Sequence, residues 1–301
     1  VTPTQPYLSP ALSGMLDAEI WVKVETTTPI ASFKLRGALN SLLALREQGK
    51  APAVATTAST GNHGQGVARA AQLLGIPCSI FVPTGCNEVK KAAMQRFGAE
   101  VFEGGDDIDD ARDNCDAFAN KTVGASIIDD GMVREVIEGA GTIGLEIAMA
   151  VPGVDYALMP MGSGALVGGA ATALKSLIPH AKVFAAQSSG APAMTMSLKA
   201  RQYIEHPVNT ICDCLASRRP AHLALETVIR TVDDSILVDD EDILTAIREL
   251  ALDAHIIVEP GAAAGFAAAK KIREKIKGKT VVISLTGANI DSKTLGRAMQ
   301  Q

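Results

Sequence analysis

Residues 53–83 read AVATTASTGNHGQGVARAAQLLGIPCSIFVP, and this stretch decides the fold class. A short run rich in β-branched residues at 53–57 predicts a strand. The apolar spacing of 63–74 then predicts a helix, which a glycine closes. A second short apolar run at 79–82, ended by a proline, predicts another strand. A strand, a helix and a strand in this order form a βαβ unit, which implies a parallel sheet with a helix packed on its face.

The same alternation continues along the rest of the chain. Further strands are predicted at 20–24, 101–102, 156–161, 183–187 and 280–285, and further helices at 88–97, 106–120, 166–177, 221–229, 242–254, 261–275 and 290–299. This order predicts an α/β fold of open, twisted, mostly parallel sheets with helices on both faces. Ligands of such sheets bind beyond the carboxyl ends of the strands, so we expect the site at glycine-rich turns between a strand and a helix.

Size and composition fit a globular protein and exclude several function classes. Of the 301 residues, 47% are hydrophobic and 20% are charged, so a packed core is expected and global disorder is excluded. The formal charge is −5 with both signs interspersed, which argues against binding to nucleic acid or to an anionic membrane. No run of about 20 apolar residues predicts a membrane span, and the first ten residues lack the pattern of a secretory signal.

Cysteine usage indicates the redox compartment. Five cysteines are scattered along the chain, at positions 78, 86, 115, 212 and 214. An odd number at wide spacing argues against a disulfide framework, so we expect free thiols and a cytoplasmic protein. The pair Cys212 and Cys214 lacks both the spacing and the histidine partner of a zinc site, so no metal is expected there.

Four segments carry residue types that perform chemistry. The first is 32–37, SFKLRG, in which Lys34 lies between two apolar residues. A desolvated lysine favours its uncharged form, and its amine can then act as a nucleophile or a base. The alternative is a surface lysine at the start of a helix, with its ammonium group in water.

The second segment, 57–64, reads TASTGNHG and joins the first strand of the βαβ unit to its helix. It brings hydroxyls, an amide, an imidazole and backbone N–H groups to a helix N-terminus, where an anion such as a carboxylate binds well. The alternative is an ordinary helix cap, in which Ser59, Thr60 or Asn62 satisfies backbone donors and His63 only packs.

The remaining two segments also follow predicted strands. Segment 160–166, PMGSGAL, has small residues whose backbone N–H groups can close around a phosphate, although a tight turn is the alternative. It is neither a Walker loop nor a dinucleotide motif, because no Gly-Lys-Ser/Thr follows and Val167 stands where the third glycine would be. Segment 284–289, SLTGAN, delivers a hydroxyl and an amide to the same sheet edge and would be mostly structural by itself.

Together, in this order, the four segments resemble the fold-type II pyridoxal-phosphate enzymes, the family of threonine and serine dehydratases and serine racemase. Matching stretches GTIGLE at 141–146 and EPGAA at 259–263 extend the resemblance to nearly the whole chain. The resemblance implies two domains, as in the β subunit of tryptophan synthase, with the cofactor in the cleft between them. The large domain would consist of residues 1–49 and 129–301, and the small, mobile domain of residues 50–128.

The resemblance also implies a role for each matching residue. Lys34 would hold pyridoxal 5'-phosphate as a Schiff base and remove the α-proton, while Phe33 would pack beside the ring. Asn62 would donate a hydrogen bond to the phenolic oxygen of the ring, and Thr286 would face the pyridine nitrogen. The phosphate would be held by backbone groups of Gly162, Ser163, Gly164, Ala165 and Leu166. The substrate carboxylate would be held by Ser59, Thr60, Asn62 and His63.

The implied function is a dehydratase (ammonia-lyase) that converts L-threonine, L-serine or a related 3-hydroxy amino acid to a 2-oxo acid and ammonia by β-elimination. The alternatives are an amino-acid racemase, such as serine racemase, and a non-catalytic protein that kept the fold. Thr60 bears on this choice, because serine racemase has a serine at that position, on the ring face opposite the lysine. A β-branched threonine has fewer ways to aim its hydroxyl, so elimination is expected to dominate.

Two further positions bear on metal binding. In serine racemase and related dehydratases a glutamate, and an aspartate six residues later, help to hold a divalent ion. The matching positions here are Gln187 and Ala193, so no metal is expected. The relatives are commonly dimers, which implies a homodimer whose other partner is a small-molecule amino acid.

Overall fold

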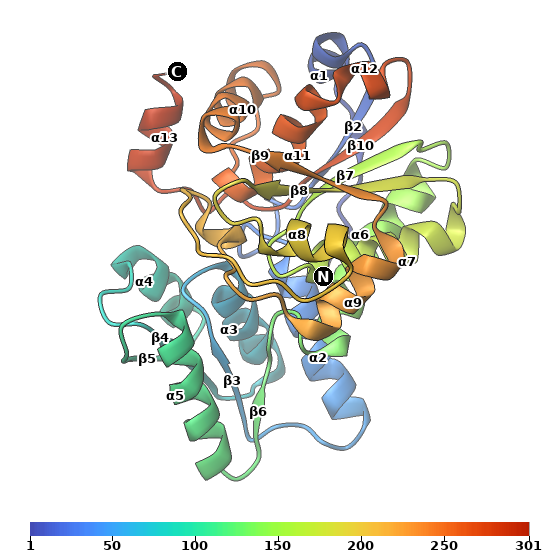
Figure 1. Ribbon diagram of the computed structural model, residues 1–301. Coiled ribbons are helices and arrows are strands. Elements are labelled where there is room, and N and C mark those ends of the chain that lie inside the picture. Colours follow the sequence, from blue (N-terminus) through green and yellow to red (C-terminus); the bar gives the residue numbers. More distant parts are fainter. Residues whose placement is uncertain (301) are drawn as a thin grey trace.

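Two sheets form the frame of the molecule in the computed structural model, which describes residues 1–300 (Figure 1). The six-stranded sheet has the order β1 (Tyr7–Leu8), β2 (Glu19–Val24), β10 (Thr280–Leu285), β7 (Tyr156–Pro160), β8 (Lys182–Ser188) and β9 (Asp234–Val238). All of its strand pairs are parallel except that of β1 with β2. The four-stranded sheet is wholly parallel and has the order β5 (Glu100–Glu103), β4 (Cys78–Val82), β3 (Val54–Ala58) and β6 (Ala125–Ile127).

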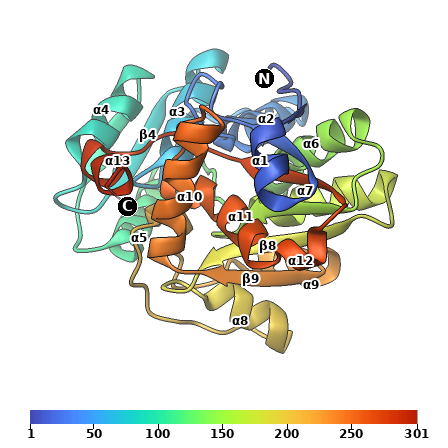
Figure 2. The same cartoon turned by 90° about the horizontal axis from the view of Figure 1, so that it is seen from above.

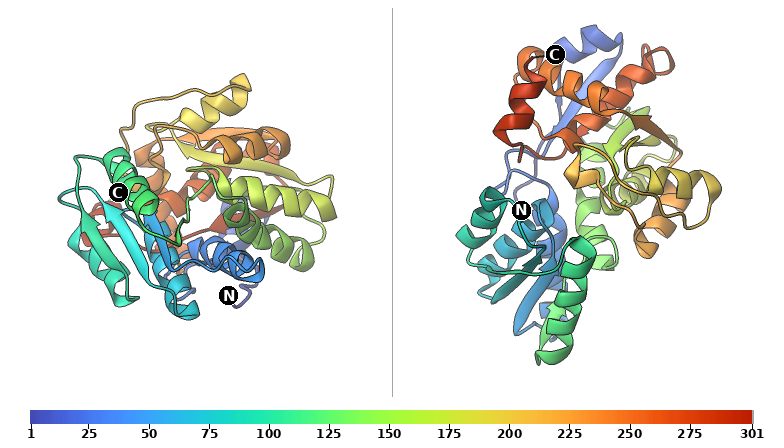
Figure 3. Two further views of the ribbon diagram at one scale, coloured as in Figure 1. Left: turned by 90° about the horizontal axis from the view of Figure 1, so that it is seen from below. Right: turned by 60° about the vertical axis from the view of Figure 1, so that its left-hand side comes forward.

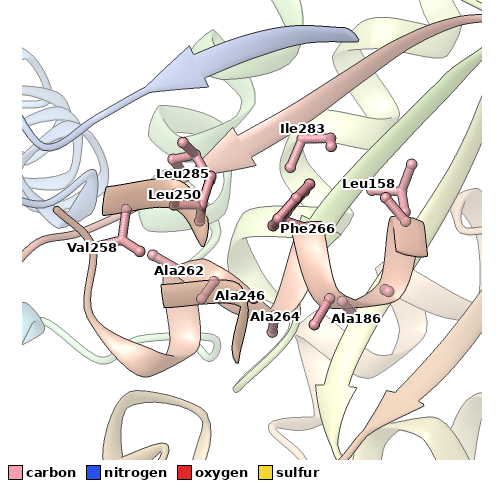
Figure 4. Packing of buried hydrophobic residues seen from close by; sticks show 14 of the residues in the cluster. Leu158, Ala186, Ala246, Leu250, Val258, Ala262, Ala264, Phe266, Ile283 and Leu285 are labelled. Carbon is pink, nitrogen blue, oxygen red and sulfur yellow. The ribbon is translucent and has the colours of Figure 1, made fainter. Parts of the chain in front are cut away.

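Helices cover both faces of the six-stranded sheet. One face carries α1 (Pro10–Leu16), α10 (Asp240–Asp253) and α11 (Pro260–Lys271), which lie together when the molecule is seen from above (Figure 2). The other face carries α6 (Arg134–Ala150), α7 (Ala165–Leu177) and α9 (His222–Thr231). Strand β7 shows why two cores form, because Leu158 packs into the first face whereas Ala157 and Met159 pack into the second. Phe266 of α11 lies in the first core with Leu158 and Ile283 (Figure 4).

The four-stranded sheet also has two covered faces. One face packs against α2 (Lys34–Glu47) and α3 (Asn62–Leu74), with α4 (Glu88–Arg96) at the edge. The other face packs against α5 (Ile108–Lys121), where the rings of Phe81 and Phe102 stack with their centroids 5.1 Å apart. Helix α2 contacts both α3 and α6, so it joins the two sheets (Figure 3).

The α/β class with mostly parallel sheets is confirmed, and several elements differ from the expectation. The strands β1, β6 and β9 and the helices α1, α2, α6 and α8 (Ala193–Ala200) were not among the predicted elements. The helix expected at 106–120 begins at Ile108, because the carboxylate of Asp107 accepts hydrogen bonds from the N–H groups of Asp109 and Asp110 and caps it. The helix expected at 261–275 is interrupted at Ile272, which separates α11 from α12 (Arg273–Ile276). The remaining helical elements are η1 (Asp213–Leu215), a 3₁₀ turn, and α13 (Ser292–Ala298).

Two expectations from composition are tested by the structure. All five cysteines are free thiols, as expected. Among residues 1–300, none of the helices is long and apolar enough to cross a bilayer. The division of the chain into domains at 49/50 and 128/129 stays a prediction.

Candidate active site

A cavity of about 480 Å³ lies among the segments that follow β3 and β7, at the carboxyl ends of these strands. It brings together seven of the residues expected at the site, which come from three separate stretches of the chain: Lys34, Ser59, Thr60, Asn62, His63, Gly162 and Ser163. This is the position at which parallel sheets commonly bind ligands.

Lys34 is the first residue of α2, and the chain around it holds it in place. The N–H of Phe33 donates to the carbonyl of Thr286 at 3.0 Å, and Ser32 forms a β-bridge with Gly287, so the start of α2 is tied to the end of β10. The Nζ atom of Lys34 lies 4.8 Å from the centroid of the Phe33 ring. Only 14% of the Lys34 side chain is exposed, which excludes the surface lysine that was the alternative.

Arg36, two residues further on, anchors α2 to its neighbours. Its guanidinium, 3% exposed, donates from Nε to Glu25 at 2.8 Å and from Nη1 to Glu146 at 2.6 Å. Lys23 completes this buried group through an ion pair of 2.7 Å with Glu146. Breaking one partner of a buried ion pair costs several kcal/mol, because it leaves an uncompensated charge. The Arg of the first segment and the Glu of GTIGLE therefore fix the helix that carries Lys34.

Asp130 is the direct partner of Lys34, and the sequence did not point to it. Its Oδ2 atom contacts Lys34 Nζ and accepts a hydrogen bond from the Ser163 hydroxyl at 3.0 Å. Burial acts to raise the pKa of Asp130, but the ammonium of Lys34, the nearby His63 and the Ser163 hydrogen bond together lower it to about 2. Asp130 is therefore ionised at neutral pH. It follows β6, a three-residue strand that is too short to give a periodic signal.

The turn that opens α3 combines both interpretations of segment 57–64. The hydroxyl of Ser59 accepts hydrogen bonds from the N–H groups of Gly61 and Gly64, at 3.3 and 3.1 Å, and thus acts as a cap. His63 donates from Nε2 to the carbonyl of Ile128 at 2.7 Å, because a carbonyl can only accept. Thr60 lines the cavity, is half-buried, and has no hydrogen-bond partner for its hydroxyl within residues 1–300, so it is available to a ligand.

Segment 160–166 forms a cradle at the N-terminus of α7. Gly164 has a φ of +94°, a conformation that glycine adopts without strain, and a Cβ on Gly162 would lie 2.8 Å from the carbonyl oxygen of Cys214. In the part of the chain that the structure describes, no protein acceptor pairs with the N–H groups of Gly162, Ser163 and Gly164. Unpaired N–H groups at the positive end of a helix dipole suit a phosphate.

Comparison with known proteins decides the family. The model of the family described as pyridoxal-phosphate dependent enzyme matches residues 1–287. This chain belongs to that family. An L-threonine ammonia-lyase of Thermotoga maritima is 36% identical over 294 residues, which cover 97% of this chain and 73% of that protein. A catabolic L-threonine dehydratase of Staphylococcus aureus is 35% identical over 289 residues, which cover 95% and 82%.

Solved structures of relatives share the fold of the enzyme. The processed form of threonine deaminase isoform 2 from Solanum lycopersicum superposes with a TM-score of 0.93 at 30% identity, over 99% of this chain and 87% of that one. Maize serine racemase gives a TM-score of 0.92 at 30% identity, over 99% and 91%. The enzyme is therefore similar both to dehydratases and to a racemase. The fold-type II architecture and dependence on pyridoxal phosphate are confirmed.

The residues of the cavity fit this cofactor. Lys34 offers a half-buried amine, the 162–164 loop offers unpaired N–H groups to a phosphate, and Asn62 offers an amide in the same cavity. Five of the expected cofactor-binding residues do not line the cavity, namely Phe33, Gly164, Ala165, Leu166 and Thr286. Ala165 and Leu166 are buried in the helix packing of α7, so the N–H groups at the start of that helix are the parts that could reach a ligand.

Charged residues of both sheets' surroundings also line the cavity. The guanidinium of Arg218 pairs with Asp109 of α5 at 2.5 Å. Lys90 of α4 pairs with Asp213 of η1. Both pairs connect the four-stranded part to the segment 201–220 of the six-stranded part. No local pattern predicted them, because the partners lie more than 100 residues apart.

Gln187 and Ala193, the two positions that the resemblance matched to a divalent-ion site, offer no carboxylate. The Oε1 atom of Gln187 accepts a hydrogen bond from the N–H of Thr195 at 2.8 Å, and Ala193 begins α8. The amide orientation follows from the backbone donor, so the Nε2 atom of Gln187 is the one that has no partner among residues 1–300. An amide nitrogen repels a cation rather than binding it.

Proposed function

We propose that the enzyme is a dehydratase (ammonia-lyase) that converts L-threonine, L-serine or a related 3-hydroxy amino acid to a 2-oxo acid and ammonia. The observation that carries the proposal is the convergence of Lys34, the 59–63 turn, Gly162 and Ser163 on one cavity. The names of the relatives support it, since those at 34–36% identity are L-threonine ammonia-lyases and dehydratases.

Each group of site residues has a role in this proposal. When bound, pyridoxal phosphate supplies an electron sink that stabilises negative charge at the α-carbon of an amino acid. The loop 162–164 would hold the phosphate, Phe33 would pack beside the ring, and Asn62 would donate to its phenolic oxygen. Thr286, buried next to Phe33, would face the pyridine nitrogen.

Lys34 and the 59–63 turn would act on the substrate. The free amine of Lys34 would take the proton from the α-carbon onto Nζ, and the ionised carboxylate of Asp130, in contact with Nζ, stabilises the ammonium that results. The hydroxyl of Thr60 and the N–H groups at the start of α3 would orient the substrate carboxylate, with Ser59, Asn62 and His63 shaping the turn.

The test is a product assay on a panel of 3-hydroxy amino acids. We expect steady release of pyruvate from L-serine or of 2-oxobutanoate from L-threonine, with ammonia in equal amount. Chiral chromatography of the remaining amino acid decides between the candidate activities. D-serine that accumulates as fast as pyruvate would move the assignment to a racemase, and no 2-oxo acid from any member of the panel would remove the dehydratase.

Thr60 variants sharpen that choice. Thr60→Ala should keep elimination within about tenfold of the unaltered enzyme, because the α-proton leaves toward Lys34. Thr60→Ser keeps a hydroxyl with a freer χ1, so any racemisation should rise in this variant alone. The ratio of D-serine to pyruvate, measured for the three proteins side by side, reports both effects. Loss of elimination in both variants would instead make Thr60 essential to the reaction.

Three wider statements belong to the same proposal. The enzyme would be a homodimer, as its relatives commonly are, and its five free cysteines suit the cytoplasm. Residues 50–128 would form a small domain that moves against residues 1–49 and 129–301 when substrate binds. The separate four-stranded sheet supports this division, and small-angle scattering with and without substrate would test it.

A further inference from the structure

The amide of Asn62 belongs to a chain of hydrogen bonds that determines its orientation. The Nδ2 atom of Asn289 donates to the carbonyl oxygen of Ile30 at 2.9 Å and to Oδ1 of Asn62 at 2.6 Å. The Nδ2 atom of Asn62 in turn donates to Oε1 of Glu259 at 2.6 Å. A backbone carbonyl can only accept, so the nitrogen and oxygen of both amides are assigned without ambiguity. Among residues 1–300, the second N–H of Asn62 has no acceptor.

This chain joins parts of the molecule that are far apart in sequence. Asn62 begins α3 beside the four-stranded sheet, whereas Glu259 precedes α11 and Asn289 follows β10 of the six-stranded sheet. Asn62 and Glu259 are 7% and 4% exposed, and both line the cavity with Lys34. Their contact is therefore protected from water, where a hydrogen bond contributes most to orientation.

The space for the Glu259 carboxylate exists because residue 287 is glycine. A Cβ on Gly287 would lie 2.0 Å from Oε1 of Glu259 and 3.4 Å from Nδ2 of Asn62. The N–H of Glu259 also donates to the carbonyl of Gly287 at 3.0 Å. A methyl group at this position would displace the carboxylate from Asn62 without straining the backbone, since the φ of Gly287 is not positive.

The buried carboxyl group of Glu259 is unfavourable for folding, which indicates that it is kept for a role in the site. Burial raises its pKa to about 7, Asp213 acts in the same direction, and the hydrogen bond from Asn62 opposes them. Within residues 1–300, Glu259 forms no ion pair with a lysine, arginine or histidine within 4.0 Å. A buried carboxyl group without a cation destabilises the fold, and within the described part of the chain the side chain that donates a hydrogen bond to Glu259 is that of Asn62.

We propose that Glu259 and Asn289 are positioning residues that hold the Asn62 amide with its free N–H available to the phenolic oxygen of the cofactor. Glu259 acts by accepting one Asn62 N–H, and Asn289 acts by occupying the Asn62 oxygen. The inference rests on the proposed function only through the role given to Asn62 in binding the cofactor.

Cofactor binding to the apoenzyme is the test. Pyridoxal phosphate is titrated into each protein, and both its dissociation constant and its visible absorption band are recorded. Glu259→Leu should raise the dissociation constant about tenfold and shift the band, because Asn62 loses its acceptor. Glu259→Gln is the matched control, because it keeps an acceptor oxygen for Asn62, and its dissociation constant should stay within about threefold of that of the unaltered protein.

A double-mutant cycle separates positioning from a general effect on the cavity. In an Asn62→Ala background, Glu259→Leu should change the dissociation constant by less than about twofold, since the residue through which Glu259 acts is gone. Gly287→Ala should raise the dissociation constant and shift the band as Glu259→Leu does. It replaces Glu259→Leu in the test if that variant does not fold. Additive losses, or an unshifted band in both Glu259→Leu and Gly287→Ala, would overturn the proposal.

These readouts do not depend on what the enzyme does to its substrate. If the product assay identifies a racemase, the cofactor titrations keep their meaning. If 2-oxo acids are formed and Glu259→Leu nevertheless binds the cofactor normally, the positioning role of Glu259 is refuted and the proposed dehydratase activity stands.

Discussion

At the scale of the residue, the chemistry of the main side chains of the site is set by close neighbours. Lys34 contacts Asp130 and Asn62 donates to Glu259, whereas no residue among 1–300 pairs with the hydroxyl of Thr60. The pKa values of the two carboxyl groups are shifted in opposite directions. The pKa of Asp130 lies at about 2 and that of Glu259 at about 7, because the first faces an ammonium and the second faces an amide in a buried setting.

Lys34→Ala should remove both the visible band of bound cofactor and turnover, by at least about a thousandfold. Lys90→Ala is the matched control, since Lys90 lines the same cavity and pairs with Asp213. The control should keep the band. The measurement is the absorption spectrum before and after borohydride reduction, followed by peptide mapping. A reduced cofactor found on another lysine would contradict the assignment.

Glu259 should make the stability of the apoenzyme depend on pH. Its pKa is raised from an ordinary 4.5 to about 7 in the folded state, so its contribution to stability is complete below pH 4.5 and declines as pH rises toward 7. Across this window the unfolding free energy of the unaltered protein should fall relative to Glu259→Gln, by on the order of 3 kcal/mol. Urea unfolding of both proteins from pH 5 to 8 measures the difference. Parallel curves would show that Glu259 is not the titrating group.

At the scale of the element, the site depends on how helices begin. Helix α2 starts at Lys34 against the end of β10, α3 starts at Asn62 with Ser59 as its cap, and α7 starts after the left-handed Gly164. Each helix thus presents its N-terminal N–H groups or first side chain toward the cavity. Helix α8 differs from these three, because an N–H group of its first turn, that of Thr195, already donates to the side chain of Gln187.

Catalysis should be independent of Mg²⁺ and Ca²⁺ at the position of α8. The oxygen of Gln187 is already used by Thr195, and Ala193 offers no ligand, so little affinity for a hard cation remains. Dialysis against EDTA should leave the rate of 2-oxo acid formation and the melting temperature unchanged. Gln187→Glu combined with Ala193→Asp is the informative comparison, since it introduces two carboxylates. A large loss with EDTA that Mg²⁺ restores in the unaltered enzyme would refute this expectation.

At the scale of the whole molecule, two sheets meet around the cavity and ion pairs cross its rim. Arg218 reaches Asp109, and Lys90 reaches Asp213, so residues of both parts are linked beside the site. The side chains of Arg218 and Asp213 are 46% and 56% exposed, and such pairs are individually worth about 0–1 kcal/mol. That is too little to stabilise the fold and enough to bias an equilibrium between open and closed cavities.

Arg218→Gln should therefore raise KM for the amino acid by up to about fivefold, with a smaller change in kcat and no change in melting temperature. Arg219→Gln is a closely matched control, because Arg219 pairs with Glu205 of its own segment. Added salt should raise KM in the unaltered enzyme more than in Arg218→Gln, since screening weakens the same ion pair. Steady-state kinetics at low and high ionic strength check this. Equal changes of KM in Arg218→Gln and Arg219→Gln would show that the ion pair between Arg218 and Asp109 does not favour the closed cavity.

Much of the fold follows from local patterns, and the missing elements show the limit of such patterns. The unit β3–α3–β4 was predicted nearly to its ends, because a β-branched run, a helical period and glycine or proline breaks occur in order. Strands β6 and β9 were not predicted, since β6 has three half-buried residues and β9 begins with two exposed or polar positions. Helix α6 was not predicted because glycines in a sequence usually indicate the end of a helix. In the structure these glycines let α6 approach α7 closely.

The sequence by itself determined the α/β class, the lysine, and the three turns that meet at the cavity, because each depends on neighbouring residues or on a set of motifs in order. Only the tertiary structure decided which groups face one another. Lys34 and Asp130 are 96 residues apart, and Asn62 and Glu259 are 197 apart, so no local period connects them. The charge state of a buried carboxyl depends on these distant neighbours and on the exclusion of water, and both arise when the two sheets close around the cavity.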